Sequence, residues 1–321
     1  MFAIYADKPD FDNPLSALVI GERPEPKLLD GWIRVKVSAV ALNWHDLWTL
    51  RGMGMRPIAF PMILGCDGAG TLDDGAEILI YPLMGNPDWK EDETIDPDRN
   101  VFSELHPGTM ADYAFVPRRN IIVRPKELTQ VEGAALGTAW LTAYRMLFTR
   151  SNLRAGQTML VQGASGGVST ALIQLGNAAG MNVWATGRTE EKQKLARNLG
   201  AQRTFAPGEK LPEKVDAVFD TVGAATWKHS LHSVRTGGTI VTCGAHTGRD
   251  PSAELGQLFR EQISVHGSYL GTLHEFRNLL TFVTTHGIRP QIGEILPMEK
   301  AEKGFRDMWE GRTAGKFVFT R

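Results

Sequence analysis

The stretch LVQGASGGVSTALIQLG, residues 160–176, places three glycines between an apolar run and an amphipathic one. An apolar strand over 158–163, a glycine turn and a helix that starts near residue 168 are the context that a dinucleotide-binding loop requires. The first amides of such a helix lack intrahelical partners and lie at the positive end of its dipole, so they attract a pyrophosphate. The stretch therefore predicts a coenzyme site, with contacts from Ser165, Gly166, Gly167 and Val168.

The glycine spacing of this loop departs from the strict G-x-G-x-x-G pattern. Ala164, Gly166 and Ser169 occupy the three glycine positions, so only the central glycine is present. The central glycine lets the backbone approach the phosphate, whereas the last one serves helix–strand packing, for which serine is the next smallest polar residue. We therefore predict that the loop binds a dinucleotide; a plain strand-to-helix turn is the alternative.

The end of the next strand, within NVWATGRTEEK (182–192), indicates which coenzyme is bound. A carboxylate about 20 residues past the loop would select NAD by bonding the ribose 2′-hydroxyl. Gly187 and Arg188 stand there instead, with Lys192 one helical turn further on, and a guanidinium suits a 2′-phosphate. We predict NADPH, held in part by these three residues, and Thr189 as the cap of the following helix. In the alternative interpretation, Arg188 is only a solvated loop residue.

Four short apolar runs alternate with helix-like stretches in this part of the chain: TMLVQG, MNVWATG, AVFDTVG and GTIVTCG. Such alternation predicts βαβ units and a doubly wound parallel sheet, hence an α/β fold. Ligands bind at the carboxyl ends of the strands in such sheets. The positions that end the third and fourth runs are therefore predicted to flank the coenzyme: Val222, Cys243, Gly244 and Ala245.

The remainder of the chain has different patterns. Strand patterns at 32–42, 76–85 and 112–125 predict that the first 120 residues are mainly β. GNPDWKEDETIDPDRN (85–100) is acidic and interrupted by proline, which predicts a solvated surface loop without a metal site. Residues 128–148 have helical periodicity with Thr129 as N-cap. The isolated strand KFVFT (316–320) can return to the first domain.

Length and composition limit the class of protein. A chain of 321 residues predicts two domains. Apolar content of 42%, charged content of 22% and a formal charge of −1 predict a soluble globular protein and argue against a nucleic-acid partner. No apolar run approaches the roughly 18 residues that span a membrane, and the first residues lack a signal pattern. Cys66 and Cys243 are the only cysteines, which excludes a disulfide framework and predicts a cytoplasmic location.

Seven motifs, in order along essentially the whole chain, resemble those of the medium-chain dehydrogenase/reductase superfamily: ALNWHDLWTLRG, PMILGCDGAG, GTAWLTAYRML, VQGASGGVSTALIQLGNAAG, DTVGAATW, GGTIVTCGAHTG and AGKFVF. Within it, the chain is similar to the zinc-independent, quinone-oxidoreductase-like branch. The resemblance implies a GroES-like, mainly β catalytic domain over 1–121 and 287–321, a Rossmann domain over 122–286 and an active-site cleft at their junction. It also implies a homodimer, formed by extending the coenzyme-domain sheet edge to edge.

By the same resemblance, the positions that bind catalytic zinc in other members hold Asn43, Cys66 and Thr138 here. Zinc needs about three protein ligands with borderline-soft atoms, and an amide and a hydroxyl are poor substitutes. Residues 85–110 contain no cysteine, so the four-cysteine structural lobe of those members is missing as well. We therefore predict that the protein uses no metal.

The resemblance also implies roles for residues near the reaction. It puts Asn43 beside the nicotinamide, where its amide could bond the substrate oxygen, and His45 where other members keep a proton-relaying hydroxyl. A histidine can donate a proton near neutral pH. Asp46 would orient a neighbour or cap the next helix. Further coenzyme contacts are carried over to Thr142, Ser268 and Tyr269.

Each of these assignments has a structural alternative. Asn43 could satisfy a turn, His45 could be a hydrogen-bonded loop residue, and Cys66 could be an inert buried thiol. Asp67 replaces the acid usual beside the metal and could be structural. Trp44 and Trp48 could shape an apolar substrate pocket or pack in the core.

Without a Lewis acid a saturated alcohol is hard to oxidise, whereas an activated C=C bond or a quinone needs less help. The resemblance therefore implies an NADPH-dependent, metal-free oxidoreductase that transfers hydride to a quinone or an α,β-unsaturated carbonyl. Two alternatives stay open: a zinc-type alcohol dehydrogenase and a non-catalytic NADPH-binding protein. A Rossmann methyltransferase is disfavoured, because the second strand ends on a basic residue instead of an acid.

Overall fold

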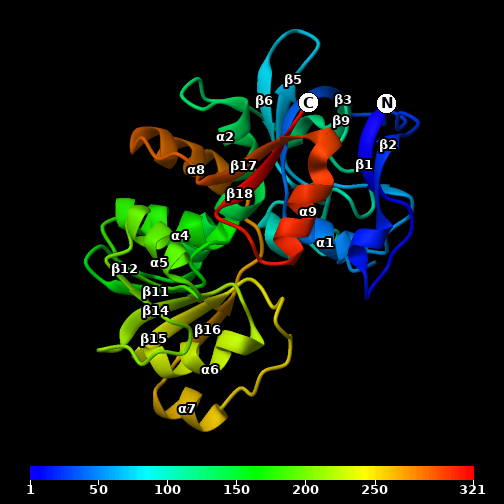
Figure 1. Cartoon of the computed structure of the whole chain (residues 1–321). Coiled ribbons are helices and arrows are strands. Elements are labelled where there is room, and N and C mark those ends of the chain that lie inside the picture. Colours follow the sequence, from blue (N-terminus) through cyan, green and yellow to red (C-terminus); the bar gives the residue numbers. More distant parts are fainter. The chain divides into compact units, whose positions relative to one another are not determined.

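The computed structural model describes all 321 residues, which form two compact units (Figure 1). Unit 1 comprises residues 1–139 and 271–321, and unit 2 comprises residues 140–270. These limits differ from the expected domain bounds of 122 and 286, because two helices assigned to the coenzyme domain pack within unit 1. A Cβ on Gly133 of α2 (Gln130–Ala134) would lie 2.4 Å from Leu79 Cδ2. The ring of Phe276 in α8 (Leu273–Thr285) lies 6.3 Å from that of Tyr81.

Unit 2 is built on a six-stranded, all-parallel sheet with the order β13-β12-β11-β14-β15-β16. The order runs outward in both directions from β11, which confirms the predicted Rossmann arrangement. The strands are β11 (Thr158–Gln162), β12 (Asn182–Thr186), β13 (Arg203–Phe205), β14 (Val215–Asp220), β15 (Val234–Thr242) and β16 (Ser264–Gly267).

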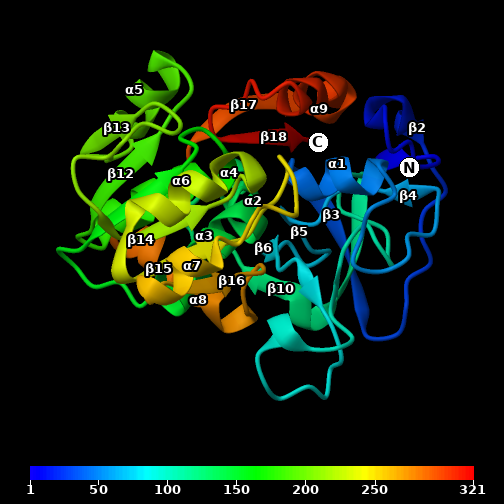
Figure 2. The same cartoon turned by 90° about the horizontal axis from the view of Figure 1, so that it is seen from below.

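Helices connect these strands (Figures 1 and 2): α4 (Gly167–Ala178), α5 (Glu190–Asn198), α6 (Ala224–Ser233) and α7 (Leu255–Arg260). The chain moves from β11 toward one edge of the sheet through α4 and α5, and from β14 toward the other edge through α6. Right-handed crossovers therefore put α6 on the opposite face from α4 and α5. Thr189 caps α5 as predicted, because its side chain accepts a hydrogen bond from Lys192 N.

The predicted helical stretch at 128–148 runs from Gln130 to Arg150. Thr129 caps it in a capping box with Glu132, as predicted. Two π-helical turns interrupt the α-helix, so the stretch consists of α2, η4 (Leu136–Trp140), α3 (Leu141–Tyr144) and η5 (Arg145–Arg150). Thr138 lies in the first of these turns.

Unit 1 is mainly β, as predicted. Its largest sheet has the order β10-β6-β5-β3-β18-β17 with β9 also paired to β3; a second sheet has the order β2-β1-β4, and β7 pairs with β8. The strands are β1 (Phe2–Ala6), β2 (Leu18–Glu22), β3 (Trp32–Ala41), β4 (Met62–Ile63), β5 (Gly68–Thr71), β6 (Glu77–Ile80), β7 (Leu83–Met84), β8 (Asn100–Val101), β9 (Tyr113–Pro117), β10 (Ile121–Val123), β17 (Ile292–Pro297) and β18 (Lys316–Thr320). The helices besides α2 and α8 are α1 (Trp44–Leu50), α9 (Ala301–Trp309) and the short turns η1 (Pro14–Ala17), η2 (Glu93–Ile95), η3 (Arg118–Asn120) and η6 (Met298–Lys300).

The C-terminal strand β18 returns to the first unit, which confirms the expectation for KFVFT. It pairs antiparallel with β3, with Val318 opposite Ala41, and parallel with β17. Phe317 and Phe319 are buried in the unit 1 core, where Phe319 stacks on Phe305 of α9. This pairing brings the last strand beside the residues that lead from β3 into α1.

The acidic segment 85–100 is more ordered than the solvated loop that we predicted. Asp96 is 2% exposed, and its carboxylate accepts hydrogen bonds from Asn86 N and Asp98 N. Asp92 caps η2 by accepting from Thr94 N. Short polar side chains that bond the backbone two residues on stabilise such turns, so acidic composition here marks turns as well as exposure.

No helix of the protein is both long enough and apolar enough to cross a membrane.

Candidate active site

Asp46 anchors the start of α1 to the segment that follows β4. Its carboxylate accepts hydrogen bonds from Asn43 N and Gly65 N, both at 2.8 Å. Gly65 has a φ of +94°, and a Cβ there would lie 2.6 Å from Thr109 Oγ1, so only glycine fits beside the carboxylate. Burial raises the pKa of Asp46 to about 6, against the opposing effect of His45. Asp46 thus does cap the helix, as one sequence interpretation held.

Asn43 is buried and all its polar side-chain atoms have protein partners. Its Nδ2 donates to Ala41 O at 3.0 Å and to Asp67 Oδ2 at 3.1 Å. Its Oδ1 accepts a 2.5 Å hydrogen bond from Lys316 Nζ, which also donates to Leu42 O at 2.6 Å. Because an ammonium has no acceptor, Lys316 fixes which way the amide points. The contact to Lys316 was not predicted.

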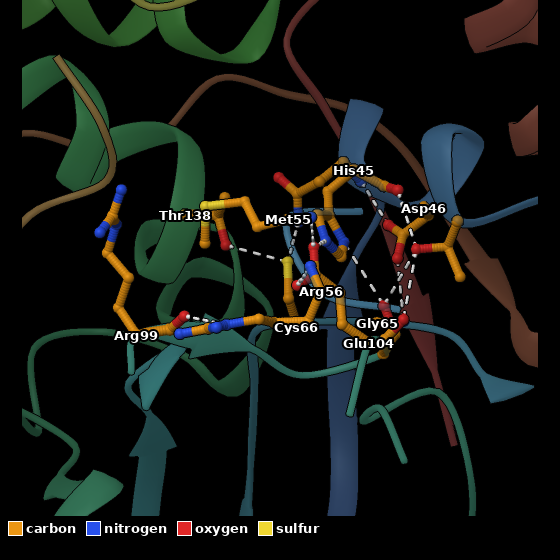
Figure 3. Close-up of polar contacts among 12 residues, drawn as sticks. His45, Asp46, Met55, Arg56, Gly65, Cys66, Arg99, Glu104 and Thr138 are labelled. Carbon is orange, nitrogen blue, oxygen red and sulfur yellow. Dashed lines mark hydrogen bonds and ion pairs between the residues drawn. The ribbon is translucent and has the colours of Figure 1, made fainter. Parts of the chain in front are cut away.

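Cys66 and Thr138 lie beside this amide. Cys66 Sγ is 3.7 Å from Asn43 Nδ2 and 3.4 Å from Thr138 Oγ1 (Figure 3). The structure therefore brings together the three side chains that the resemblance aligned with metal ligands. Burial raises the pKa of the Cys66 thiol, and the neighbouring carboxylates of Asp67 and Asp46 add to the effect.

His45 lies in the first turn of α1 (Figure 3). Two consecutive residues of another segment lie at its two ring nitrogens. His45 Nε2 is 3.1 Å from Glu104 Oε1, and His45 Nδ1 is 3.4 Å from Ser103 Oγ. Glu104 also accepts from Met55 N and Arg56 N, and its side chain is only 1% exposed against 15% for His45. A carboxylate on Nε2 favours the tautomer that carries its proton there.

Trp44, also on α1, packs against the unit 1 core and lies 6.5 Å from the ring of Trp309.

In unit 2, the predicted coenzyme loop precedes α4. Gly166 is the N-cap, no side chain caps the helix, and the first turn holds no acid. The amides of Gly167, Val168 and Ser169 therefore start a 12-residue helix without intrahelical partners. A Cβ on Gly166 would meet no protein atom closer than 3.9 Å, so space above the loop stays open for a phosphate.

Ser169 occupies the position of the missing last glycine without disrupting the loop. It is 3% exposed, and its Oγ lies 3.4 Å from Thr221 Oγ1 at the end of β14. The extra hydroxymethyl group thus has a hydrogen-bonding partner just past the carboxyl end of β14. The departure from the strict motif leaves the N-terminus of α4 unobstructed.

Arg188 and Lys192 lie at the end of β12 and in the first turn of α5. Arg188 is exposed, and no carboxylate pairs with its guanidinium. Burial lowers the pKa of Lys192, and the positive charge of Arg188 adds to that lowering, which means that the two cations lie near each other. Two neighbouring cations of this kind favour an anion between them.

The other predicted coenzyme contacts also follow strands of the parallel sheet. Gly187 follows β12 and donates its N–H to Phe205 O. Val222 follows β14, Ser268 and Tyr269 follow β16, and Cys243, Gly244 and Ala245 follow β15. Parallel strands align their carboxyl ends, so these positions and the glycine loop all lie at the carboxyl ends of the strands. Ser268 Oγ is buried without a protein partner, and Thr142 lies in α3.

Sequence reasoning missed Lys316, Ser103 and Glu104. Lys316 directly precedes the apolar run of β18, which is a usable signal, because a lysine is almost never fully buried unless paired. Ser103 has a φ of +65°, which is uncommon for a residue other than glycine. No local pattern indicates that Ser103 and Glu104 meet His45.

The chain matches two family models. One, described as alcohol dehydrogenase GroES-like domain, covers residues 29–126; the other, described as zinc-binding dehydrogenase, covers residues 167–285. The chain is also similar over its full length to a solved structure of an NAD-dependent alcohol dehydrogenase, with 28% identity and a TM-score of 0.92 over 100% of both chains.

Three curated relatives represent different activities. A zinc-type alcohol dehydrogenase-like protein of Schizosaccharomyces pombe is 27% identical, with 91% of each chain covered. An acryloyl-coenzyme A reductase of Metallosphaera sedula is 28% identical, covering 94% of this chain and 96% of that protein. A quinone oxidoreductase of Mus musculus is 28% identical, covering 89% and 88%.

The residues of unit 1 do not fit the zinc that one family model and the S. pombe relative name. Asn43 turns an N–H toward Cys66, and a hydrogen-bond donor cannot bind a cation. Its oxygen is already taken by the ammonium of Lys316. Of the three aligned side chains, only the thiol of Cys66 is a good zinc ligand, and no group of three His, Cys, Asp or Glu side chains in the chain could hold a metal.

We expect Asp46 to make stability depend on pH. Its folded pKa of about 6 lies above the ordinary value of 3.8, so the folded protein holds this proton more tightly than the unfolded chain does. The contribution to the free energy of unfolding is therefore largest at low pH and falls, by on the order of 3 kcal/mol, as the pH rises from about 4 to about 7.

Urea unfolding of wild type and Asp46→Asn across this pH range measures the effect. The difference in unfolding free energy between the two proteins should change with pH, with wild type losing stability relative to the variant toward neutral pH. Asp73→Asn, at an exposed turn, is the control. Parallel curves for wild type and Asp46→Asn would contradict the assignment.

Proposed function

The chain belongs to the medium-chain dehydrogenase/reductase superfamily of oxidoreductases, which bind a nicotinamide coenzyme, and from this premise we propose its specific activity. We propose that it is an NADPH-dependent, metal-free reductase of a quinone or an α,β-unsaturated carbonyl compound. The observation that carries the proposal is the set of side chains at the Asn43 centre, which offers an amide, a thiol and a hydroxyl in place of a metal site.

The coenzyme proposal rests on three features of unit 2. The uncapped α4 N-terminus and the open space above Gly166 suit a pyrophosphate. The neighbouring cations Arg188 and Lys192, with no acid at the end of β12, suit the 2′-phosphate of NADPH over the 2′-hydroxyl of NADH. Ser268 Oγ, also at the carboxyl ends of the strands, is buried without a protein partner, so a coenzyme could supply its hydrogen bond.

The substrate proposal follows from the absence of suitable metal ligands among the residues. A bound NADPH would supply hydride. The chain itself has no Lewis acid to acidify an alcohol, so an electron-poor C=C bond or a quinone is the acceptor that needs the least activation. Relatives whose names state acryloyl-coenzyme A reductase and quinone oxidoreductase support both acceptor classes.

Reduction of such an acceptor also needs a proton, and we propose His45 as its source. His45 is the partly exposed member of the group that contains Ser103 and Glu104. Glu104 holds the imidazole by one nitrogen, so the ring keeps a defined orientation. In this proposal Asp46 orients α1, and Asn43 orients Asp67 and Cys66.

We further propose a homodimer joined through β16, the edge strand of the unit 2 sheet. Val265 on this strand is exposed, and the adjoining α7 exposes Leu255 and Phe259 at 71% and 73%. An edge strand left open beside exposed apolar side chains invites pairing with another chain, and a second copy of the same strand would close it symmetrically. The unpaired cysteines Cys66 and Cys243 support a reducing, cytoplasmic location.

Coenzyme titration tests the NADPH assignment. Arg188→Ala should weaken NADPH binding roughly 10- to 100-fold, the equivalent of one charge-assisted hydrogen bond, and leave NADH binding unchanged. Lys194→Ala, at an exposed lysine on the helix that follows Arg188, is the matched control and should change neither affinity. Equal affinity of wild type for NADPH and NADH would refute the preference.

Turnover on a panel of quinones and α,β-unsaturated ketones and thioesters tests the reaction and the role of His45. His45→Gln should lower kcat on the best substrate by about 10²-fold or more, without changing NADPH affinity, because the lost group is a proton donor. His286→Gln, on the exposed end of α8, is the control. No NADPH consumption by wild type on any member would instead favour a non-catalytic binding protein.

Sedimentation tests the dimer. Wild type should sediment as a dimer, and the double variant Val265→Asp with Phe259→Asp as a monomer, because two buried carboxylates would oppose the joined edges. Val123→Asp, at an exposed site on an edge strand of unit 1, should stay dimeric. A monomeric wild type would contradict the proposal.

A further inference from the structure

Lys316 is a lysine in the interior of unit 1. It opens β18, is 3% exposed, and is followed by a buried apolar run. Burying an ammonium is costly unless the charge is compensated and its protons are bonded. Lys316 Nζ bonds Leu42 O and Asn43 Oδ1, which are neutral acceptors, so the opposite charge must come from further away.

Asp67 is the charge that compensates Lys316. It is fully buried, and its Oδ2 accepts the Asn43 Nδ2–H at 3.1 Å, while Oδ1 has no hydrogen-bond partner. Burial raises the pKa of Asp67, and the ammonium of Lys316 opposes that shift. Burial likewise lowers the pKa of Lys316, and Asp67 opposes it. The two charges therefore stabilise each other across a single amide.

The same centre contains the thiol of Cys66 and the hydroxyl of Thr138, side chains aligned with metal ligands in zinc-type relatives. A buried centre that contains a carboxylate, here Asp67, needs a positive charge to balance it. Here β18 pairs with β3, and this pairing places the ammonium of Lys316 beside Asn43, just after the end of β3.

We propose that Lys316 is the resident cation of this centre: acting through Asn43, it balances Asp67, fixes the orientation of the amide and keeps metal cations out. Lys316 is thus a positioning residue. Its catalytic importance rests on the proposed function, whereas its electrostatic role does not depend on any substrate.

Removal of the ammonium should convert the centre into a cation site. Lys316→Met keeps most of the apolar stem but leaves Leu42 O and Asn43 Oδ1 without their donor and Asp67 without its counter-charge. With the ammonium gone, nothing holds the Asn43 oxygen in its present position, so this oxygen can turn toward Cys66 and form, with the carboxylate of Asp67 and Cys66 Sγ, a donor set for a divalent cation. Binding would break the Cys66 S–H bond, form a sulfur–metal bond and release the proton to the buffer, without any redox change.

Cadmium titration of the full-length protein tests this proposal, because cadmium–thiolate bonds absorb in the ultraviolet. Lys316→Met should bind Cd²⁺ about tenfold or more tightly than wild type and show the thiolate band. The band should vanish in Lys316→Met with Cys66→Ala. Lys303→Met, which removes an exposed lysine paired with Glu294 and Asp307, should behave as wild type.

Two results would overturn the proposal: a cadmium–thiolate band of equal strength in wild type, or a folded Lys316→Met that gains no affinity. If Lys316→Met does not fold, its combination with Asp67→Asn decides. The double variant should be more stable than Lys316→Met alone, because it removes the lone buried charge; a double variant no more stable would refute the compensation. These measurements need no substrate. An inactive wild type would therefore contradict the proposed function without contradicting the role proposed for Lys316.

Discussion

The hydrogen bond from Lys316 to Asn43 joins the last strand of the chain to the start of α1. It orients the side chains on which the proposed chemistry of unit 1 depends. It forms because β18 pairs with β3, which puts the start of the last strand beside the residues that enter α1. The bond orients the Asn43 amide so that its Nδ2 faces both Asp67 and Cys66. The ammonium of Lys316 lies on the other side of this amide and balances the charge of Asp67 across it. Without this contact, Asp67 would be a buried charge with no counter-ion, which is among the most destabilising features a core can contain.

The two units contribute in different ways. Unit 2 presents backbone and sheet-edge positions: an uncapped helix N-terminus, an open glycine loop and two adjacent cations. Unit 1 presents side chains held by buried hydrogen bonds. A scaffold of this kind can present different side chains at the Asn43 centre, because a fold does not fix the chemistry of the site that it carries.

Local signals explain what could be predicted from the sequence. The glycine loop, the alternation of strands and helices, and the caps at Thr129 and Thr189 are all encoded within short windows. The buried network was not predictable in this way. Lys316 and its partner Asn43 are 273 residues apart in the sequence, and Glu104 and His45 are 59 apart. The residues around each side chain contain no signal that identifies its partner. The acidic segment 85–100 was misjudged only in part: Asp88 and Asp98 are exposed, as predicted, whereas Asp92 and Asp96 bond backbone amides.

In the interpretation proposed above, an ammonium, and not a metal, provides the positive charge at the Asn43 centre. Crystals of the protein grown with excess Zn²⁺, with X-ray data collected on both sides of the zinc absorption edge, test it most directly. We expect no anomalous peak within bonding distance of Cys66 Sγ, and electron density that joins Lys316 Nζ to the Asn43 side chain. An anomalous peak bonded to Cys66 Sγ, with Lys316 turned away, would contradict it.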